Sequence, residues 1–155
     1  MKNFLKKLTV VGIIVVIFLC LAAFDYIRAQ DIEIELISIT PETVVADPDQ
    51  SVMLTLKVTK RGKPAAGDDI SALVKGQGNL SSDKVRVGED GIVVFEYFPY
   101  NYIPGVFEES DETIVFRDIS DSVFIAIQKK VSFSFHVDVP DGSSNGMKMD
   151  DLFGD

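Results

Sequence analysis

From Asp31 onward, apolar side chains recur at every second position of the chain. The clearest segment is 52–58, where Val52, Leu54, Leu56 and Val58 alternate with other residues. A period of two puts one face of a β-strand in a core, whereas a helix would need apolar residues three and four positions apart. The alternation therefore predicts a mostly β structure.

The same pattern predicts a set of short strands. After Leu36 the apolar residues change parity, which indicates a β-bulge or a change of sheet. No segment past Ile27 has helical periodicity, so a parallel sheet with its crossover helices is excluded. Seven or eight short strands predict an all-β, antiparallel β-sandwich with Greek-key connections, with a small barrel as the alternative. Beyond 52–58, the expected strands lie within 32–39, 70–74, 85–87, 93–97, 114–116 and 123–139, the last forming one bent strand or two.

One turn carries a strong local signal. Asp90 and Gly91 lie between the apolar residues Val87 and Val93. An Asp-Gly pair between two strands is typical of a two-residue β-hairpin. We therefore expect these two strands to pair with each other.

The N-terminal segment differs in kind from the rest. Lys6 and Lys7 precede an uncharged apolar run, 8–24, which would be about 25 Å long as a helix and just spans a bilayer core. Positive charge before the run places the N-terminus in the cytoplasm and the following residues outside. The run is therefore a single-pass anchor in the cytoplasmic membrane or, alternatively, a signal peptide of a secreted protein.

Three parts follow along the chain. Residues 1–30 hold the Lys-rich cytoplasmic end and the membrane anchor or signal peptide, residues 31–140 the β-sandwich, and residues 141–155 a disordered acidic tail. Only a short stalk, from Asp25 to Gln30, would separate the sandwich from the bilayer. The sandwich therefore stays close to the membrane.

Charge excludes some classes of partner. The chain has 24 Asp and Glu against 15 Lys and Arg, a net charge of -9. A nucleic-acid binder needs a basic surface to displace counterions, so nucleic acid is not a partner. The same acidity repels anionic lipid, and we expect membrane contact only through residues 8–24.

Residues that carry chemistry are sparse. The single cysteine, Cys20, lies in the apolar run, and the single histidine, His136, is expected to face outward from a strand. A disulfide within the chain and a two-His metal site are therefore excluded. No G-x-S-x-G elbow, phosphate loop or EF-hand spacing is present, so we expect a non-catalytic protein without cofactor, metal or calcium.

The turns and strands together resemble a known family. From Ala46 the chain reads A-D-P-D-Q-S-V-x-L-T-L-x-V, then G-K-P-A-A-G from Gly62, G-Q-G-N-L-S from Gly76 and E-D-G-I-V-V-F-E-Y from Glu89. This is similar to the bacterial immunoglobulin-like domain of the invasin and intimin type, here in a single copy behind an N-terminal membrane segment. The resemblance covers roughly 37–139 and implies the fold, without implying any catalytic residue.

The segment 97–107, Y-F-P-Y-N-Y-I-P-G-V-F, is the clearest candidate for binding. Aromatic residues are enriched at protein interfaces, although the same rings could instead pack over the end of the sandwich. Near the C-terminus, an acidic segment encloses two apolar residues, in the manner of a short docking peptide. The candidate partner-binding residues are Tyr97, Phe98, Tyr100, Tyr102, Phe107, Leu152 and Phe153.

Two functional classes follow. The first is a membrane-anchored extracytoplasmic module that binds another envelope, secretion-machine or surface-structure protein. The second is a secreted or surface adhesion module that binds a glycan or a host protein through the 97–107 loop. Retention of the N-terminal segment discriminates between them.

We expect the N-terminal segment to be retained. Signal peptidase needs small residues both directly before the cleaved bond and two positions earlier. For cleavage after Ala22 the earlier position is Cys20, and for cleavage after Ala29 it is Ile27, so neither position fits well. The intact mass of the membrane-extracted protein should therefore match the 17.1 kDa chain. A mass that corresponds to cleavage at either alanine would contradict the anchor.

Overall fold

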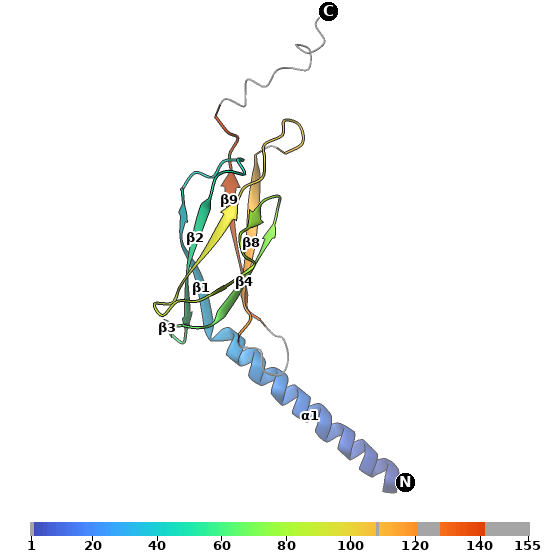
Figure 1. Ribbon diagram of the computed structural model, residues 1–155. Helices are drawn as coiled ribbons and strands as arrows, with labels where there is room; N and C mark the ends of the chain where they lie inside the picture. The colour runs from blue at the N-terminus through green and yellow to red at the C-terminus, as the bar shows by residue number, and fades with distance from the viewer. Residues whose placement is uncertain (1, 108, 121–127, 142–155) are drawn as a thin grey trace, which may run out of the picture.

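The computed structural model describes residues 2–107, 109–120 and 128–141. One long helix, α1 (Lys2–Gln30), leads into two β-sheets packed face to face (Figure 1). Within these ranges the strands are β1 (Ile32–Thr40), β2 (Val52–Lys60), β3 (Lys63–Pro64), β4 (Asp69–Lys75), β5 (Asn79–Leu80), β6 (Lys84–Arg86), β7 (Ile92–Phe98), β8 (Ser110–Asp118) and β9 (Lys130–Val137).

The predicted antiparallel sandwich is confirmed. The first sheet has the order β1-β2-β7-β5, with β3 paired to β2, and the second has the order β6-β4-β8-β9. Every pair of neighbouring strands is antiparallel. The three long strands of the first sheet face the three long strands of the second in the arrangement of an immunoglobulin domain. Two separate sheets rule out the barrel.

The core lies between the inner faces of the two sheets. In β2, Val52 and Leu54 are buried, whereas Met53 between them is exposed. The rings of Phe95 and Phe116 meet across the core with their centroids 5.3 Å apart. Since burying one such side chain contributes about 1.5–3 kcal/mol, this interleaved layer holds the sandwich together.

Two local predictions have different outcomes. The register of β1 against β2 shifts between Leu36 and Ser38, which confirms the predicted bulge. The hairpin predicted at Asp90 and Gly91 is wrong, because β6 pairs with β4 and β7 pairs with β2, in the other sheet. The turn forms locally, but long-range contact decides its partners: the Gly91 carbonyl accepts a hydrogen bond from the N–H of Val58 in β2 at 2.8 Å.

The predicted strand region 123–139 is described only in part. Residues 130–137 form β9, and the predicted segment 123–127 lies outside the described residues. The segment from Asp25 to Gln30, predicted as a short stalk, is the last part of α1, and β1 begins at Ile32. The residue between them, Asp31, is held by its N–H, which donates to the Arg28 carbonyl at 3.1 Å.

A buried carboxylate closes the core at the β4–β5 turn. Glu112 is almost completely buried and accepts a hydrogen bond from the Gln77 N–H at 2.9 Å. A Cβ on Gly76 or Gly78 would collide with Glu112 or with Tyr97, so the G-Q-G turn needs both glycines. Burial, and then the nearby Glu112 carboxylate, raises the pKa of the Tyr97 phenol well above its usual range.

The sandwich has two ends that differ in surroundings. The proximal end, which includes the β2–β3 turn, adjoins the last turn of α1, and the distal end, with the loop between β7 and β8, points away from the helix (Figure 1). A nine-residue strand such as β1 is about 30 Å long, so this distance separates the two ends.

Candidate functional site

A compact loop projects from the distal end between β7 and β8 (Figure 1). We call residues 103–107 the distal loop. The Ile103 N–H donates to the Phe107 carbonyl at 2.9 Å, and the Phe107 N–H donates back to the Ile103 carbonyl at 2.8 Å. Gly105 has a φ of 72°, a left-handed conformation that glycine adopts without strain. The loop is therefore a closed turn with its own hydrogen bonds.

One buried tyrosine and one backbone contact join the distal loop to the sandwich. The Tyr100 hydroxyl forms a hydrogen bond of 2.9 Å with Ser110 Oγ at the start of β8. The Tyr100 ring also lies 6.3 Å from the Phe107 ring, centroid to centroid. On the other side, the Tyr102 N–H donates to the Ala46 carbonyl at 3.2 Å. These contacts fix the loop's position on the domain.

The distal loop places apolar side chains on the surface. Ile103, Val106 and Phe107 are 41%, 65% and 37% exposed. Single exposed apolar residues are common, but three of them on one five-residue turn form a patch, and such patches are typical of interaction sites. The loop is therefore the candidate binding surface.

The structure separates the aromatic residues that the sequence grouped together. Tyr97 is completely buried, with its ring edge-on to Phe135 at 5.2 Å, and Tyr100 is buried as well. These two rings are core residues and are not available to a partner. Of the other candidates, Phe98 and Tyr102 are half-buried, Phe107 is exposed, and Leu152 and Phe153 lie outside the described residues. A binding role for the accessible residues stays a prediction.

Sequence reasoning missed two residues of the patch. Ile103 and Val106 are exposed aliphatic residues, whereas the residues that composition marks as typical of interfaces are aromatic. The signal was present in the Pro104-Gly105 pair, which marks a turn and predicts that its flanking side chains point outward.

Acidic side chains surround the distal loop. Beside it, Glu109 and Asp111 are exposed, and Asp138 lies at the same end of the domain. Further acidic residues occupy the neighbouring turns between β1 and β2. The distal acidic residues are Glu42, Asp47, Asp49, Glu109, Asp111 and Asp138.

His136 lies on this acidic end and faces outward, as the alternation predicts. Its Nδ1 is 2.9 Å from Asp111 Oδ1, and its Nε2 is 3.6 Å from Asp138 Oδ1. The hydrogen bond to Asp111, with a smaller contribution from Asp138, raises the pKa of His136 above its ordinary value of 6.5. Within the described ranges, no three His, Cys, Asp or Glu side chains come together as a set of metal ligands.

Comparison with known proteins gives structural neighbours only. No family model and no curated protein matches the sequence. The structure is similar to the D00-D0 domain of intimin, with 15% identity, a TM-score of 0.46, and coverage of 68% of this chain and 48% of that one. It is also similar to a 282-residue C-terminal fragment of intimin, solved in complex with the intimin-binding domain of the translocated intimin receptor, with 20% identity, a TM-score of 0.47, and coverage of 69% and 32%.

A third neighbour is a conjugative transposon lipoprotein from Bacteroides eggerthii, with 15% identity, a TM-score of 0.41, and coverage of 68% of this chain and 96% of that one. This chain spans less than half of the length of the two intimin structures. Function is therefore inferred from this chain's own residues.

The support of the distal loop can be tested by mutation. Tyr100→Ala should lower the free energy of unfolding by about 3–5 kcal/mol, because it removes a buried ring and its hydrogen bond to Ser110. Val106→Ala, at an exposed position, should change it by about 0.5 kcal/mol or less. Denaturant unfolding of the detergent-solubilised chain measures both, and a negligible effect of Tyr100→Ala would contradict the packing.

The acidic surroundings of His136 predict that its contribution to the stability of the fold depends on pH. Because its folded pKa is raised, the stabilising contact is complete below the ordinary pKa of 6.5 and is lost as the pH rises through the folded pKa. NMR titration of the single histidine should give a midpoint above 6.5, and Asp111→Asn should move it back toward that value. A midpoint at or below 6.5 in the unmodified protein would contradict the contact.

Proposed function

We propose that this protein is a non-catalytic, membrane-anchored extracytoplasmic immunoglobulin-like module. In this proposal α1 holds the sandwich at the outer face of the cytoplasmic membrane. The distal loop is presented to a protein partner of the envelope, a secretion machine or a surface structure. The observation that supports it most is the placement of an apolar loop and an apolar helix at opposite ends of one domain.

The helix supports the anchor. Residues 6–30 are long and apolar enough to cross a membrane, by length and composition. Large side chains along it, such as Leu8, Phe18 and Leu19, are more than half exposed, so the sandwich does not cover them. A helix that is apolar all round and uncovered is stable when lipid surrounds it. Lys6 and Lys7 at its start favour a cytoplasmic N-terminus.

The distal loop indicates the chemistry of the partner. An apolar centre with a charged rim is the usual composition of a protein interface. The rim here is acidic, with Glu109 and Asp111 next to the loop, so a complementary partner has an apolar groove with basic residues around it. Such charge complementarity speeds association and selects the partner.

The contacts of several titratable side chains support a structural role. Glu112 holds the β4–β5 turn, Asp69 forms ion pairs with Lys84 and Arg86, and His136 contacts acidic neighbours on the surface. Each of these groups is used to connect strands or turns. The alternative of glycan adhesion has less support, because Tyr97 and Tyr100, the rings that could stack on a sugar, are buried.

A charge substitution on the distal loop tests the proposal. Val106→Asp places a desolvation cost at the centre of the interface, and we expect at least a tenfold loss of partner binding by the full-length membrane protein. The matched control is Leu73→Asp in β4, where the side chain is 55% exposed on the outer face of the second sheet.

The measurement is co-purification from crosslinked membranes of the native host, with the partner identified by mass spectrometry. Melting curves of both variants should match the parent, since both positions are exposed. Equal partner recovery with Val106→Asp and with the parent would contradict the distal loop as the binding surface.

A further inference from the structure

A hollow lies at the proximal end, between the last turn of α1 and the β2–β3 turn. Its volume is about 560 Å³. The helix contributes one aromatic and one basic side chain, and the β2–β3 region contributes three basic side chains. The lining residues are Phe24, Arg28, Asp31, Lys60, Arg61 and Lys63.

The shape of this hollow is fixed by contacts between the helix end and the turn. The Arg61 N–H donates to the Asp31 carbonyl at 3.0 Å, and the Arg61 guanidinium contacts Asp31 Oδ2, with the Nε at 2.8 Å. Arg61 and Gly62 both have left-handed φ values, 52° and 73°, which form the tight turn. Arg61 is therefore fixed beside the end of the helix, and Lys60 and Lys63 lie on either side of it in the sequence.

The lining is basic. One carboxylate, Asp31, faces four cationic side chains, and Asp31 is itself in contact with Arg61. Lys60 Nζ also lies 3.7 Å from Asp68 Oδ2, and Lys63 is exposed in β3. Arg28 sits over the Phe24 ring, with its guanidinium carbon 5.8 Å from the ring centroid. The hollow is thus lined by four cationic side chains, one of which, Arg28, lies over the Phe24 ring.

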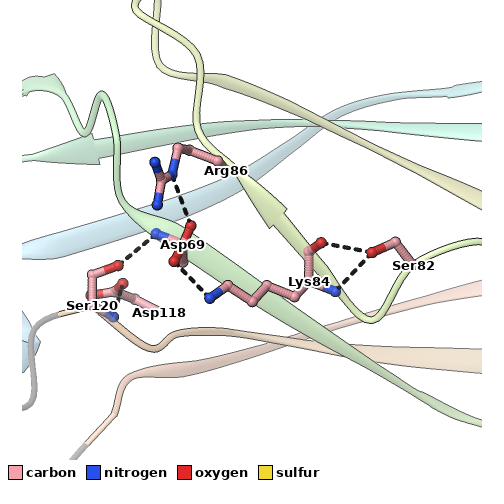
Figure 2. Close-up of polar contacts among 6 residues, drawn as sticks. All are labelled: Asp69, Ser82, Lys84, Arg86, Asp118 and Ser120. Atoms are coloured by element: carbon pink, nitrogen blue, oxygen red, sulfur yellow. Dashed lines mark hydrogen bonds and ion pairs between the residues drawn. The ribbon is translucent and has the colours of Figure 1, made fainter.

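A second pair of basic side chains, Lys84 and Arg86, lies at this end of the sandwich but does not line the hollow. Lys84 Nζ lies 2.7 Å from Asp69 Oδ2, and Arg86 Nε lies 3.2 Å from Asp69 Oδ1 (Figure 2). The hydrogen bonds from Lys84 and then Arg86 lower the pKa of Asp69, so this carboxylate stays ionised. One shared carboxylate thus holds both cations, and the backbone N–H of Asp69 donates a hydrogen bond to Ser120 Oγ at 2.5 Å.

The depth of the hollow matches the headgroup layer of a membrane. Phe24 is the last residue of the apolar run, and the basic side chains follow it directly in space. Tyr26, two residues further along the helix, is exposed, and tyrosines at the end of a transmembrane helix lie at the lipid–water interface, where lipid phosphates are found. This step rests on the proposed function, since only an anchored α1 brings the hollow to that depth.

We propose that the hollow binds the phosphate-bearing headgroup of an anionic phospholipid. Lys60, Lys63 and Arg28 supply charge to the phosphate, and Phe24 contacts the upper part of the acyl chains. The lipid bridges the helix and the β2–β3 turn, and so holds the sandwich against the membrane surface.

Native mass spectrometry of the full chain in detergent, titrated with phosphatidylglycerol, tests the proposal. The double variant Lys60→Gln with Lys63→Gln should weaken phosphatidylglycerol binding about 30-fold, as expected for two lysines near an anionic headgroup. Lys60→Arg with Lys63→Arg keeps both charges and should bind like the parent. The matched control, Lys84→Gln with Arg86→Gln, also removes two charges at this end and should lower binding by less than about threefold.

Three outcomes would overturn the proposal. The first is equal binding of phosphatidylcholine and phosphatidylglycerol. The second is a loss of phosphatidylglycerol binding in the Lys84/Arg86 variant as large as that in the Lys60→Gln, Lys63→Gln variant. The third is displacement of the lipid by inorganic phosphate, which would assign the hollow to free anions. The same spectrum reports the mass of the chain. A full-length chain without lipid preference removes the lipid site alone, whereas a chain that lacks residues 1–22 or 1–29 removes the anchor.

Discussion

The packing of two apolar sheet faces against each other governs the rest of this structure. The inward residues of β2 and β7 meet those of β8, with Phe95 and Phe116 in contact at the centre. Because each strand gives one face to this layer, its other face and its ends remain at the surface. Every candidate site therefore lies at an end of the sandwich, and the two ends belong to different surroundings.

Much of the fold could be predicted because it depends on local pattern. Alternation identified the long strands, and the parity change at Leu36 located the bulge. The pairing of β6 and β7 could not be predicted in this way, because an Asp-Gly turn has the same sequence whether it joins neighbouring strands or two sheets. The choice depends on a contact with Val58, which is distant in the sequence.

The candidate site was predicted as a segment but not residue by residue. Composition identified 97–107 as rich in aromatic residues, and its tyrosines divide by depth: Tyr97 and Tyr100 are buried, whereas Tyr102 is half-buried. The burial of each tyrosine depends on where β7 ends and on whether a polar partner lies near its hydroxyl. Ser110 is such a partner for Tyr100. The aliphatic residues Ile103 and Val106, on either side of the Pro104-Gly105 pair, form most of the exposed patch, and composition does not distinguish them from core residues.

Net charge predicted the acidity of the whole chain but not how its charges are distributed over the domain. A total of -9 argues against contact with anionic lipid, but the described charges are separated along the domain. Strand register places Lys60 opposite Ile32 and Lys130 opposite Arg117, at the end near the helix, whereas Asp111 and Asp138 lie at the other end. An acidic protein can therefore present a basic surface at one end. This separation follows from topology, which composition does not contain.

The direct passage from α1 into β1 has a mechanical consequence. With only Asp31 between helix and strand, and with Arg61 bonded across that junction, the domain and its anchor form a single lever. The distal loop lies about 30 Å from the α1–β1 junction. A change of about 10° in the tilt of the helix therefore displaces the distal loop laterally by about 5 Å. Bilayer thickness and helix inclination would then set where a docking protein meets this arm.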